Sequence, residues 1–77
     1  MVHFLIQLEV EVQGVWKEVI RYDTAHGFAH IDRFSGRGRK KKERLDLSFS
    51  EALTRAERDI KQNWLTYREQ FLEGKFP

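Results

Sequence analysis

The sequence predicts an α+β fold in which an antiparallel four-stranded sheet, in the order ββββα, carries one long C-terminal helix packed on one face. The first dozen residues alternate between apolar and polar, which is the period of a strand buried on one side. Further along, a helix start signal precedes an apolar stripe that recurs every three or four residues. The 77 residues suit a single domain, residues 1–77. One helix covers only one face of such a sheet, so the other face is expected to be open.

The first two strands are expected at about residues 2–12 and 16–23, with a turn at Gln13–Gly14. The apolar face of the first strand consists of Val2, Phe4, Ile6, Leu8, Val10 and Val12. Glycine tolerates the positive φ that tight hairpin turns require. The two strands are therefore expected to pair as an antiparallel hairpin.

The length of the hairpin loop decides between two registers. A two-residue loop pairs Val12 with Val15, but it sets Glu9 opposite Glu18 and turns the charged end of the second strand toward the core. A three-residue loop instead pairs Val12 with Trp16. Its other pairs are Leu8–Ile20, Ile6–Tyr22 and Glu11–Lys17. The three-residue loop is the one predicted, because it sets apolar residues opposite one another and brings opposite charges together.

A third strand is expected at about residues 25–34 and a fourth at 43–47, with a basic loop at 35–42 between them. The cations of this segment are Arg37, Arg39, Lys40, Lys41, Lys42 and Arg44. A local basic block of this kind is typical of phosphate contacts or of an acidic protein partner. It is equally typical of a solvated loop, so both interpretations stay open.

The helix is expected at about residues 49–73, where Ser48 and Glu51 form a capping box. Its apolar stripe consists of Phe49, Leu53, Ala56, Ile60, Trp64, Tyr67 and Phe71. A straight helix of this size is about 37 Å long, which exceeds the length of the strands. Its last turns should then overhang the sheet and leave apolar side chains such as Leu65 and Leu72 partly exposed, where a homodimer contact could cover them.

Candidate functional residues concentrate in the segment 21–33, and the third strand within it has two interpretations. In the first, Phe28 and Phe34 face the core and carry His26, His30 and Asp32 inward, which is costly without dedicated partners. In the second, the residues that face the helix are Ala25, Gly27, Ala29 and Ile31. The second interpretation is favoured, and it predicts an exposed surface of histidines and aromatic residues on the open face.

This surface suggests two functions. Metal-free RNA cleavage needs a general base, a general acid and a cation for the developing phosphorane charge. His26 and His30 could supply the base and the acid, and Arg21 or Arg33 the cation. Binding without chemistry is the other use, with Phe28 as a stacking platform for single-stranded RNA beside the basic loop. The histidines could also serve structure alone, by hydrogen bonding to the bend at residues 23–24.

Several classes are excluded or disfavoured. His26 and His30 lie four residues apart, which in an unbroken strand is roughly 13 Å, so we expect no bound metal, and no cofactor. The chain contains no cysteine, which excludes disulfides and thiol catalysis. It has neither a signal peptide pattern nor an apolar run of roughly 20 residues. A cytoplasmic protein without membrane contact is therefore expected.

The motif Arg-Tyr-Asp-x-Ala-His-Gly-x-x-His at residues 21–30 is similar to one in small uncharacterised prokaryotic proteins. More loosely, roughly residues 15–72 resemble TumE-type toxins of toxin–antitoxin pairs, which share a short sheet, a histidine-rich strand and a C-terminal helix. In such sequences we expect His-x-His at the end of the motif, where this chain has Asp32 after His30. The resemblance implies a toxin-like role directed at RNA, with an antitoxin-like protein partner.

The leading hypothesis is therefore a small toxin-like domain that binds or cleaves RNA through the open sheet face without metal. Nucleic-acid contacts are assigned to Phe28, Arg37, Arg39, Lys40, Lys41, Lys42 and Arg44. If the protein is an enzyme, the expected activity is a metal-independent, ribonuclease-like one. The alternative hypothesis is a non-catalytic protein-interaction module that forms a homodimer.

Overall fold

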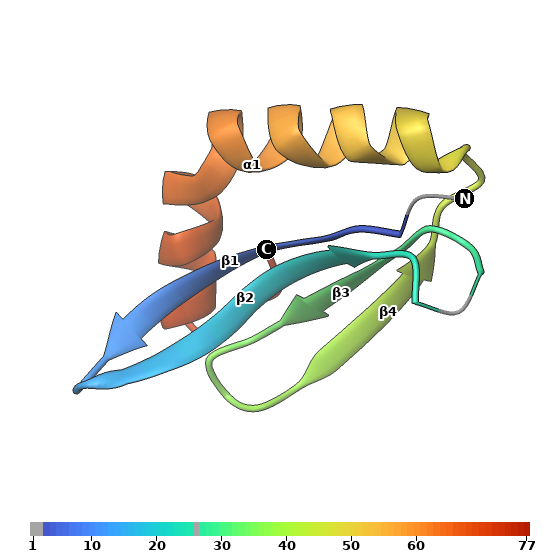
Figure 1. The fold of residues 1–77 in the computed structure, drawn as a ribbon. Helices are drawn as coiled ribbons and strands as arrows, with labels where there is room; N and C mark the ends of the chain where they lie inside the picture. Colours follow the sequence, from blue (N-terminus) through green and yellow to red (C-terminus); the bar gives the residue numbers. More distant parts are fainter. Residues whose placement is uncertain (1–2, 26) are drawn as a thin grey trace.

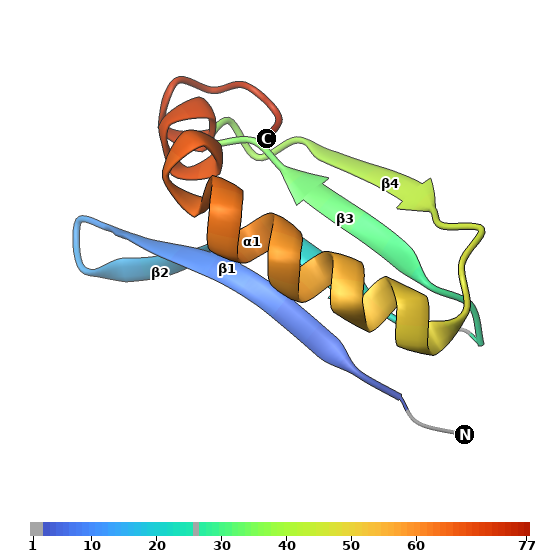
Figure 2. The same cartoon turned by 90° about the horizontal axis from the view of Figure 1, so that it is seen from above.

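The computed structural model describes residues 3–25 and 27–77, which form one sheet and one helix (Figure 1). The elements are β1 (Leu5–Val12), β2 (Val15–Asp23), β3 (His30–Phe34), β4 (Lys40–Arg44) and α1 (Phe49–Leu72). The strands pair antiparallel in the order β1-β2-β3-β4. Seen from above, the helix crosses one face of the sheet, and β1 and β4 form the two edges (Figure 2). The predicted α+β architecture is confirmed.

The β1–β2 hairpin combines both registers that the sequence offers. At its tip Val12 pairs with Val15, and Gln13 and Gly14 have φ values of 51° and 81°. Positive φ at both central residues is the property of a type I′ turn. The predicted three-residue loop is thus wrong. Beyond a register shift, however, the predicted pairs Leu8–Ile20 and Ile6–Tyr22 are present.

A β-bulge reconciles the two registers. The pairing runs from Glu9–Glu18 directly to Leu8–Ile20, so Val19 is the extra residue on β2. Both Val19 and Ile20 are buried, although neighbouring residues of a regular strand face opposite sides. The bulge therefore lets the hairpin close with a two-residue turn without turning the charged end of β2 into the core.

The second half of the sheet differs from the expected bounds. Residues 24–25 and 27–29 lie outside any strand, because the Asp23 carboxylate accepts a hydrogen bond from the Ala25 N–H at 2.6 Å and the chain turns there. Strand β4 covers Lys40–Arg44 rather than residues 43–47, so the last three residues of the expected basic loop are strand. The apolar residue Leu45 was predicted to lie in the fourth strand, but it follows β4. Its side chain lies in the core, and its N–H donates to the Ala29 carbonyl at 2.8 Å.

The helix begins as predicted and ends close to the predicted residue. The Glu51 N–H donates to the Ser48 hydroxyl at 3.1 Å, and the Ser48 N–H donates to the Glu51 carboxylate at 3.3 Å, which completes the capping box. At the other end Gly74 has φ 81°, and its N–H donates to the Phe71 carbonyl. Within the described residues, no helix is long and apolar enough to span a membrane.

The helix does not overhang as a straight rod, because it bends in its second half and its last turns descend beside the sheet (Figure 1). The bend divides the core in two. The larger cluster of buried residues contains Ile20, Tyr22, Ala29, Ile31, Leu45, Ala52 and Ala56. A smaller one joins Val10 and Val19 to Phe71 at the end of the helix. Trp64, expected in the apolar stripe, is instead 49% exposed.

Hydrogen bonds to Asp59 hold the bent helix to the sheet. Its carboxylate accepts from the Tyr22 hydroxyl of β2, from the Tyr67 hydroxyl and, at 2.9 Å, from the Asn63 amide. In a straight helix Asp59 and Tyr67 would be about 12 Å apart along the axis, so the bend is what brings them together. Partial burial raises the pKa of Asp59, but these hydrogen bonds outweigh it and leave the pKa below its usual range.

The loop between β3 and β4 is fastened to the end of the helix. The Gly36 N–H donates to the Phe71 carbonyl at 3.0 Å. A Cβ at residue 36 would lie 2.4 Å from that carbonyl oxygen, so only glycine allows this approach. Arg37 lies over Gly74 in the same region. A cation beside the end of a helix is favourable for the helix dipole.

We expect Tyr67→Phe to lower the free energy of unfolding at pH 7 by about 1 to 2 kcal/mol, because a hydrogen bond to a carboxylate is lost. Burial, followed by the bond to Asp59, raises the pKa of Tyr67 to about 12. The hydroxyl therefore contributes its stability below the unfolded pKa of about 10, and this contribution is lost as the pH rises toward 12. Urea denaturation at several pH values should show the difference between wild type and variant shrinking over that window. Trp64→Phe, on an exposed neighbouring turn, is the control, and a difference that stays constant with pH would contradict the assignment.

Candidate functional site

The open face of the sheet gathers polar side chains from three strands. The β2–β3 register sets Arg21 opposite Asp32, and the Arg21 guanidinium donates to the Asp32 carboxylate at 2.7 Å. The β3–β4 register continues the same face across the sheet through the pairs His30–Arg44, Asp32–Lys42 and Phe34–Lys40. The face turned away from the helix is thus a mixed field of charged and aromatic residues centred on Asp32.

Arg21 forms ion pairs with three carboxylates. Besides Asp32 it meets Glu18 at 3.4 Å and Asp23 at 3.8 Å. The hydrogen bond to Asp32, above all, raises the pKa of Arg21. The Asp32 side chain is only 1% exposed, and Lys40 approaches it at 3.9 Å. A carboxylate this deeply buried must be paired, so Arg21 has a structural task whatever else it does.

His30 lies beside this pair and is also buried. Its Nε2 is 3.7 Å from the Asp32 carboxylate, and the residue is 2% exposed. Phe28 packs against the imidazole with ring centroids 5.7 Å apart, and the Arg44 guanidinium lies 4.6 Å above the Phe28 ring. The prediction that His30 and Asp32 are exposed is therefore wrong. They face away from the helix, but a covering layer of side chains lies against them, with Phe28 and Arg44 at His30 and with Arg21 and Lys40 at Asp32.

The predicted catalytic set is brought together only in part. Arg21 and His30 both contact Asp32, so the structure places these two predicted residues around one carboxylate. His26 lies outside the described residues, and the role of the three residues in catalysis stays a prediction. Among residues 3–25 and 27–77, no group of three or more histidines and carboxylates is arranged to hold a metal ion.

The predicted nucleic-acid contacts separate into two groups. Lys40, Lys42 and Arg44 alternate along β4 onto the open face. The remaining cations lie elsewhere: Lys41 pairs opposite Arg33 on the other face, Arg37 covers the helix end, and Arg39 belongs to the loop. All six predicted cations are exposed. The second part of the basic segment, Lys40–Arg44, is therefore an edge strand with a row of three cations on one face.

Phe34 is a member of this face that was not among the predicted site residues. Both Arg21 and Lys40 lie over its ring, at 6.0 and 5.7 Å from the centroid. Such contacts are cation–π interactions, which hold long cationic side chains in place. Strand alternation from His30 points to Phe34 on this face, and the residue also packs against the smaller core cluster.

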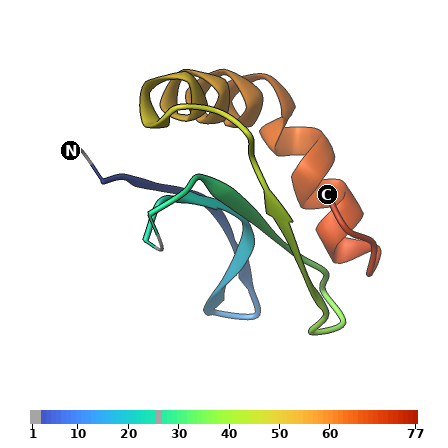
Figure 3. The same ribbon diagram turned by 90° about the vertical axis from the view of Figure 1, so that its right-hand side faces the viewer.

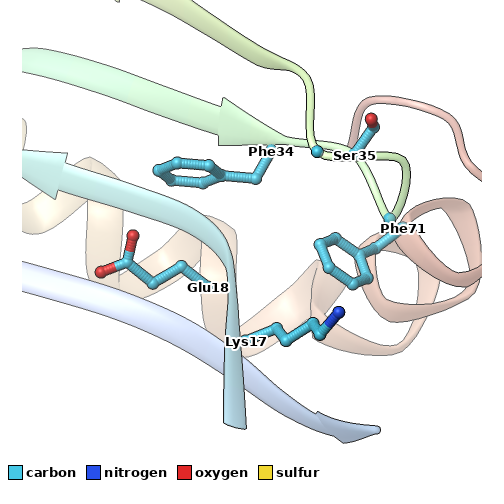
Figure 4. A pocket seen from close by; sticks show the side chains of 7 residues that line it. Lys17, Glu18, Phe34, Ser35 and Phe71 are labelled. Atoms are coloured by element: carbon cyan, nitrogen blue, oxygen red, sulfur yellow. The ribbon is translucent and has the colours of Figure 1, made fainter. Parts of the chain in front are cut away.

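A pocket of about 210 Å³ opens next to Phe34 (Figure 4). It forms where β2 runs on past the end of β3, so that the two hairpins part (Figure 3). Its lining consists of Lys17, Glu18, Phe34, Ser35, Gly36, Gly38 and Phe71. The volume is below the roughly 300 Å³ at which ligand pockets usually begin. The pocket is thus a small aromatic notch with one ammonium and one carboxylate at its wall.

The chain belongs to the family DUF7718, a domain of unknown function, whose family model matches residues 1–77. A search of curated proteins found no match, and a search of solved structures found none either. The family match confirms the expectation of an uncharacterised family. The finer likeness to TumE-type toxins stays a prediction.

We expect Arg21→Met to lower the free energy of unfolding by about 3 kcal/mol, because it leaves the Asp32 carboxylate buried without its main partner. The double variant Arg21→Met/Asp32→Leu should recover most of that loss, since it removes the charge as well as its partner. Chemical denaturation of the two variants measures this directly. Lys40→Met, which removes a more distant and more exposed cation, is the matched control. Equal stability of the single and double variants would contradict a structural role for the pair.

Proposed function

We propose that this DUF7718 domain binds single-stranded RNA through the open face of β3 and β4. The observation that carries the proposal is the β3–β4 register, which sets Lys40, Lys42 and Arg44 side by side on the face that also holds two aromatic rings. Alternate residues of a strand are about 6.6 Å apart. The three cations therefore form a straight row along the edge of the sheet, suited to follow a phosphate backbone.

The aromatic residues of this face support a single strand rather than a duplex. Unpaired bases stack on aromatic rings and on guanidinium planes. Phe28 is half-buried beneath Arg44, so a base would stack on the guanidinium and not directly on the ring. Phe34, half-buried beneath Lys40, offers a second position at the other end of the row. The looser resemblance of roughly residues 15–72 to TumE-type toxins supports RNA as the first nucleic acid to test.

The geometry favours binding over cleavage. A general base must reach the proton that it abstracts, and His30 is 2% exposed beneath Phe28. Arg21 is engaged by three carboxylates. Cleavage by these residues would require the covering layer to move, whereas binding uses side chains that are already at the surface.

Edge protection is a structural explanation for the same lysines, since charged residues on an edge strand prevent pairing with other chains. A single lysine on either face of the edge strand is enough to prevent such pairing. A row of three cations that all point to one face, with an aromatic residue at each end, is better explained by a ligand. A second candidate function is binding of an acidic protein, such as an antitoxin-like partner, because carboxylates would be attracted by the same row.

We expect labelled single-stranded RNA to bind with an affinity that falls steeply as salt rises. The triple variant Lys40→Gln/Lys42→Gln/Arg44→Gln removes three phosphate contacts, so the slope of log K against log salt should flatten by about 2. At 50 mM salt the affinity should fall on the order of 20-fold or more. Fluorescence anisotropy at several salt concentrations measures both quantities.

The control is Arg58→Gln/Lys61→Gln/Lys75→Gln, which removes the same charge from exposed positions on and after the helix. If both triple variants lose affinity equally, the binding is non-directional and the proposed site is wrong. Competition with polyglutamate separates RNA from an acidic protein as the preferred class of ligand. Incubation of the wild-type protein with RNA, followed by electrophoresis, tests the cleavage hypothesis, with His30→Gln as the variant.

A further inference from the structure

The two edges of the sheet differ in a way that the RNA-binding proposal does not use. Edge strand β4 carries four cations in five residues, which blocks pairing with another strand. Edge strand β1 is eight residues long and reads LIQLEVEV, with no lysine, arginine or proline. In Figure 2 no other described segment lies beyond β1. One edge of the sheet is thus protected and the other is open.

The free edge of β1 presents regularly spaced backbone groups. The Val12 carbonyl faces Val15 across the type I′ turn, so the even-numbered residues of β1 direct their N–H and C=O toward β2. The Phe4 carbonyl is consistent with this orientation, because it accepts a hydrogen bond from the Thr24 N–H, which follows β2, at 3.3 Å. The odd-numbered residues therefore direct their N–H and C=O outward, and these residues are Leu5, Gln7, Glu9 and Glu11.

The side chains of the same edge are incompletely covered. Phe4, Ile6 and Leu8 pack against the core but are only partly buried. Leu5, on the opposite face, is 54% exposed. A further strand beside β1 would cover apolar surface on both faces.

We propose that β1 pairs antiparallel with β1 of a second copy of this chain, which joins two sheets into one of eight strands. A two-fold axis normal to the sheet sets each residue opposite a residue of the second copy that lies on the same face. Because side chains alternate between the faces along a strand, the axis must pass beside a residue and cannot pass between two neighbouring residues. The midpoint of Leu5–Val12 falls between Leu8 and Glu9. These two residues are therefore the candidates for the centre of the interface.

Charge selects Leu8 as the centre. A register centred on Glu9 would set this carboxylate against its own copy, which is destabilising. The register centred on Leu8 sets Gln7 opposite Glu9 and Leu5 opposite Glu11, each twice, so no like charges are opposed. These are the residues whose backbone groups point outward, and they supply eight backbone hydrogen bonds. On the helix face Ile6 meets Val10, and Leu8 meets its own copy.

Residue 7 provides a test in which dimerisation and folding respond in opposite directions. Within one chain Gln7 lies opposite Arg21, so Gln7→Glu adds an attraction to the fold and Gln7→Lys adds a repulsion. Across the proposed interface residue 7 lies opposite Glu9 of the second copy, so the signs are reversed. Sedimentation equilibrium of the full chain and both variants, with circular dichroism to confirm folding, measures the dissociation constants.

The expected result is a reversible dimer of the wild-type protein, with a dissociation constant about tenfold larger for Gln7→Glu and about tenfold smaller for Gln7→Lys. A wild-type protein that stays monomeric up to about 1 mM would overturn the proposal. So would variants that leave the dissociation constant unchanged, that shift it in the same direction, or that reverse the expected order. The cations assigned to RNA lie on the opposite edge strand, so failure of this proposal would leave the RNA site on β4 untouched.

Discussion

The β-bulge at Val19 is the constraint on which the rest of this structure depends. The turn at Gln13–Gly14 closes a two-residue hairpin, and a regular ladder from that turn would reverse the faces of every residue in the second half of β2. One extra residue restores the alternation, so that Val19 and Ile20 both enter the core. Arg21 consequently stays on the face away from the helix, where it can meet Asp32. Without the bulge, neither the apolar core under the bent helix nor the ion pairs of Arg21 could form from this sequence.

The polar centre of the open face follows from the same geometry. A sheet covered by one helix leaves its other face to water, yet Asp32 and His30 are buried there. The chain achieves this with long side chains rather than with a second layer of structure, because Arg44 extends over Phe28 and Lys40 over Phe34. Long cationic side chains can cover apolar and polar groups with their aliphatic stems while their charged ends remain in water. Binding and stability are thereby coupled, since the cations assigned to phosphate contacts also shield the buried carboxylate.

The sequence predicted the elements with strong local signals and failed where a long-range contact decided the outcome. The capping box at Ser48 and the alternation of β1 are local: the helix begins as predicted, and β1 ends at the predicted Val12, although it begins at Leu5 rather than at about residue 2. The bulge could not be predicted, because each of the two registers that the sequence offers is regular along the whole hairpin. Strand β4 contains no apolar residue, so its strand character is set only by pairing with β3. The helix α1 contains no proline or glycine from which its bend could be predicted. The bend depends instead on the hydrogen bond between Tyr22 and Asp59, which are far apart in the sequence.

The contrast between the two edges connects the architecture to function. In a four-stranded open sheet, the edges are the places where unpaired backbone groups meet solvent, and each must be protected or used. The lysines of β4 protect one edge by charge, and the same charge makes that edge attractive to polyanions. If β1 is used for self-pairing, the two β4 strands become the outer edges of an eight-stranded sheet, with both open faces on the same side. Two rows of cations would then face the same direction, and two weak phosphate sites on one RNA chain would gain affinity through their high effective concentration.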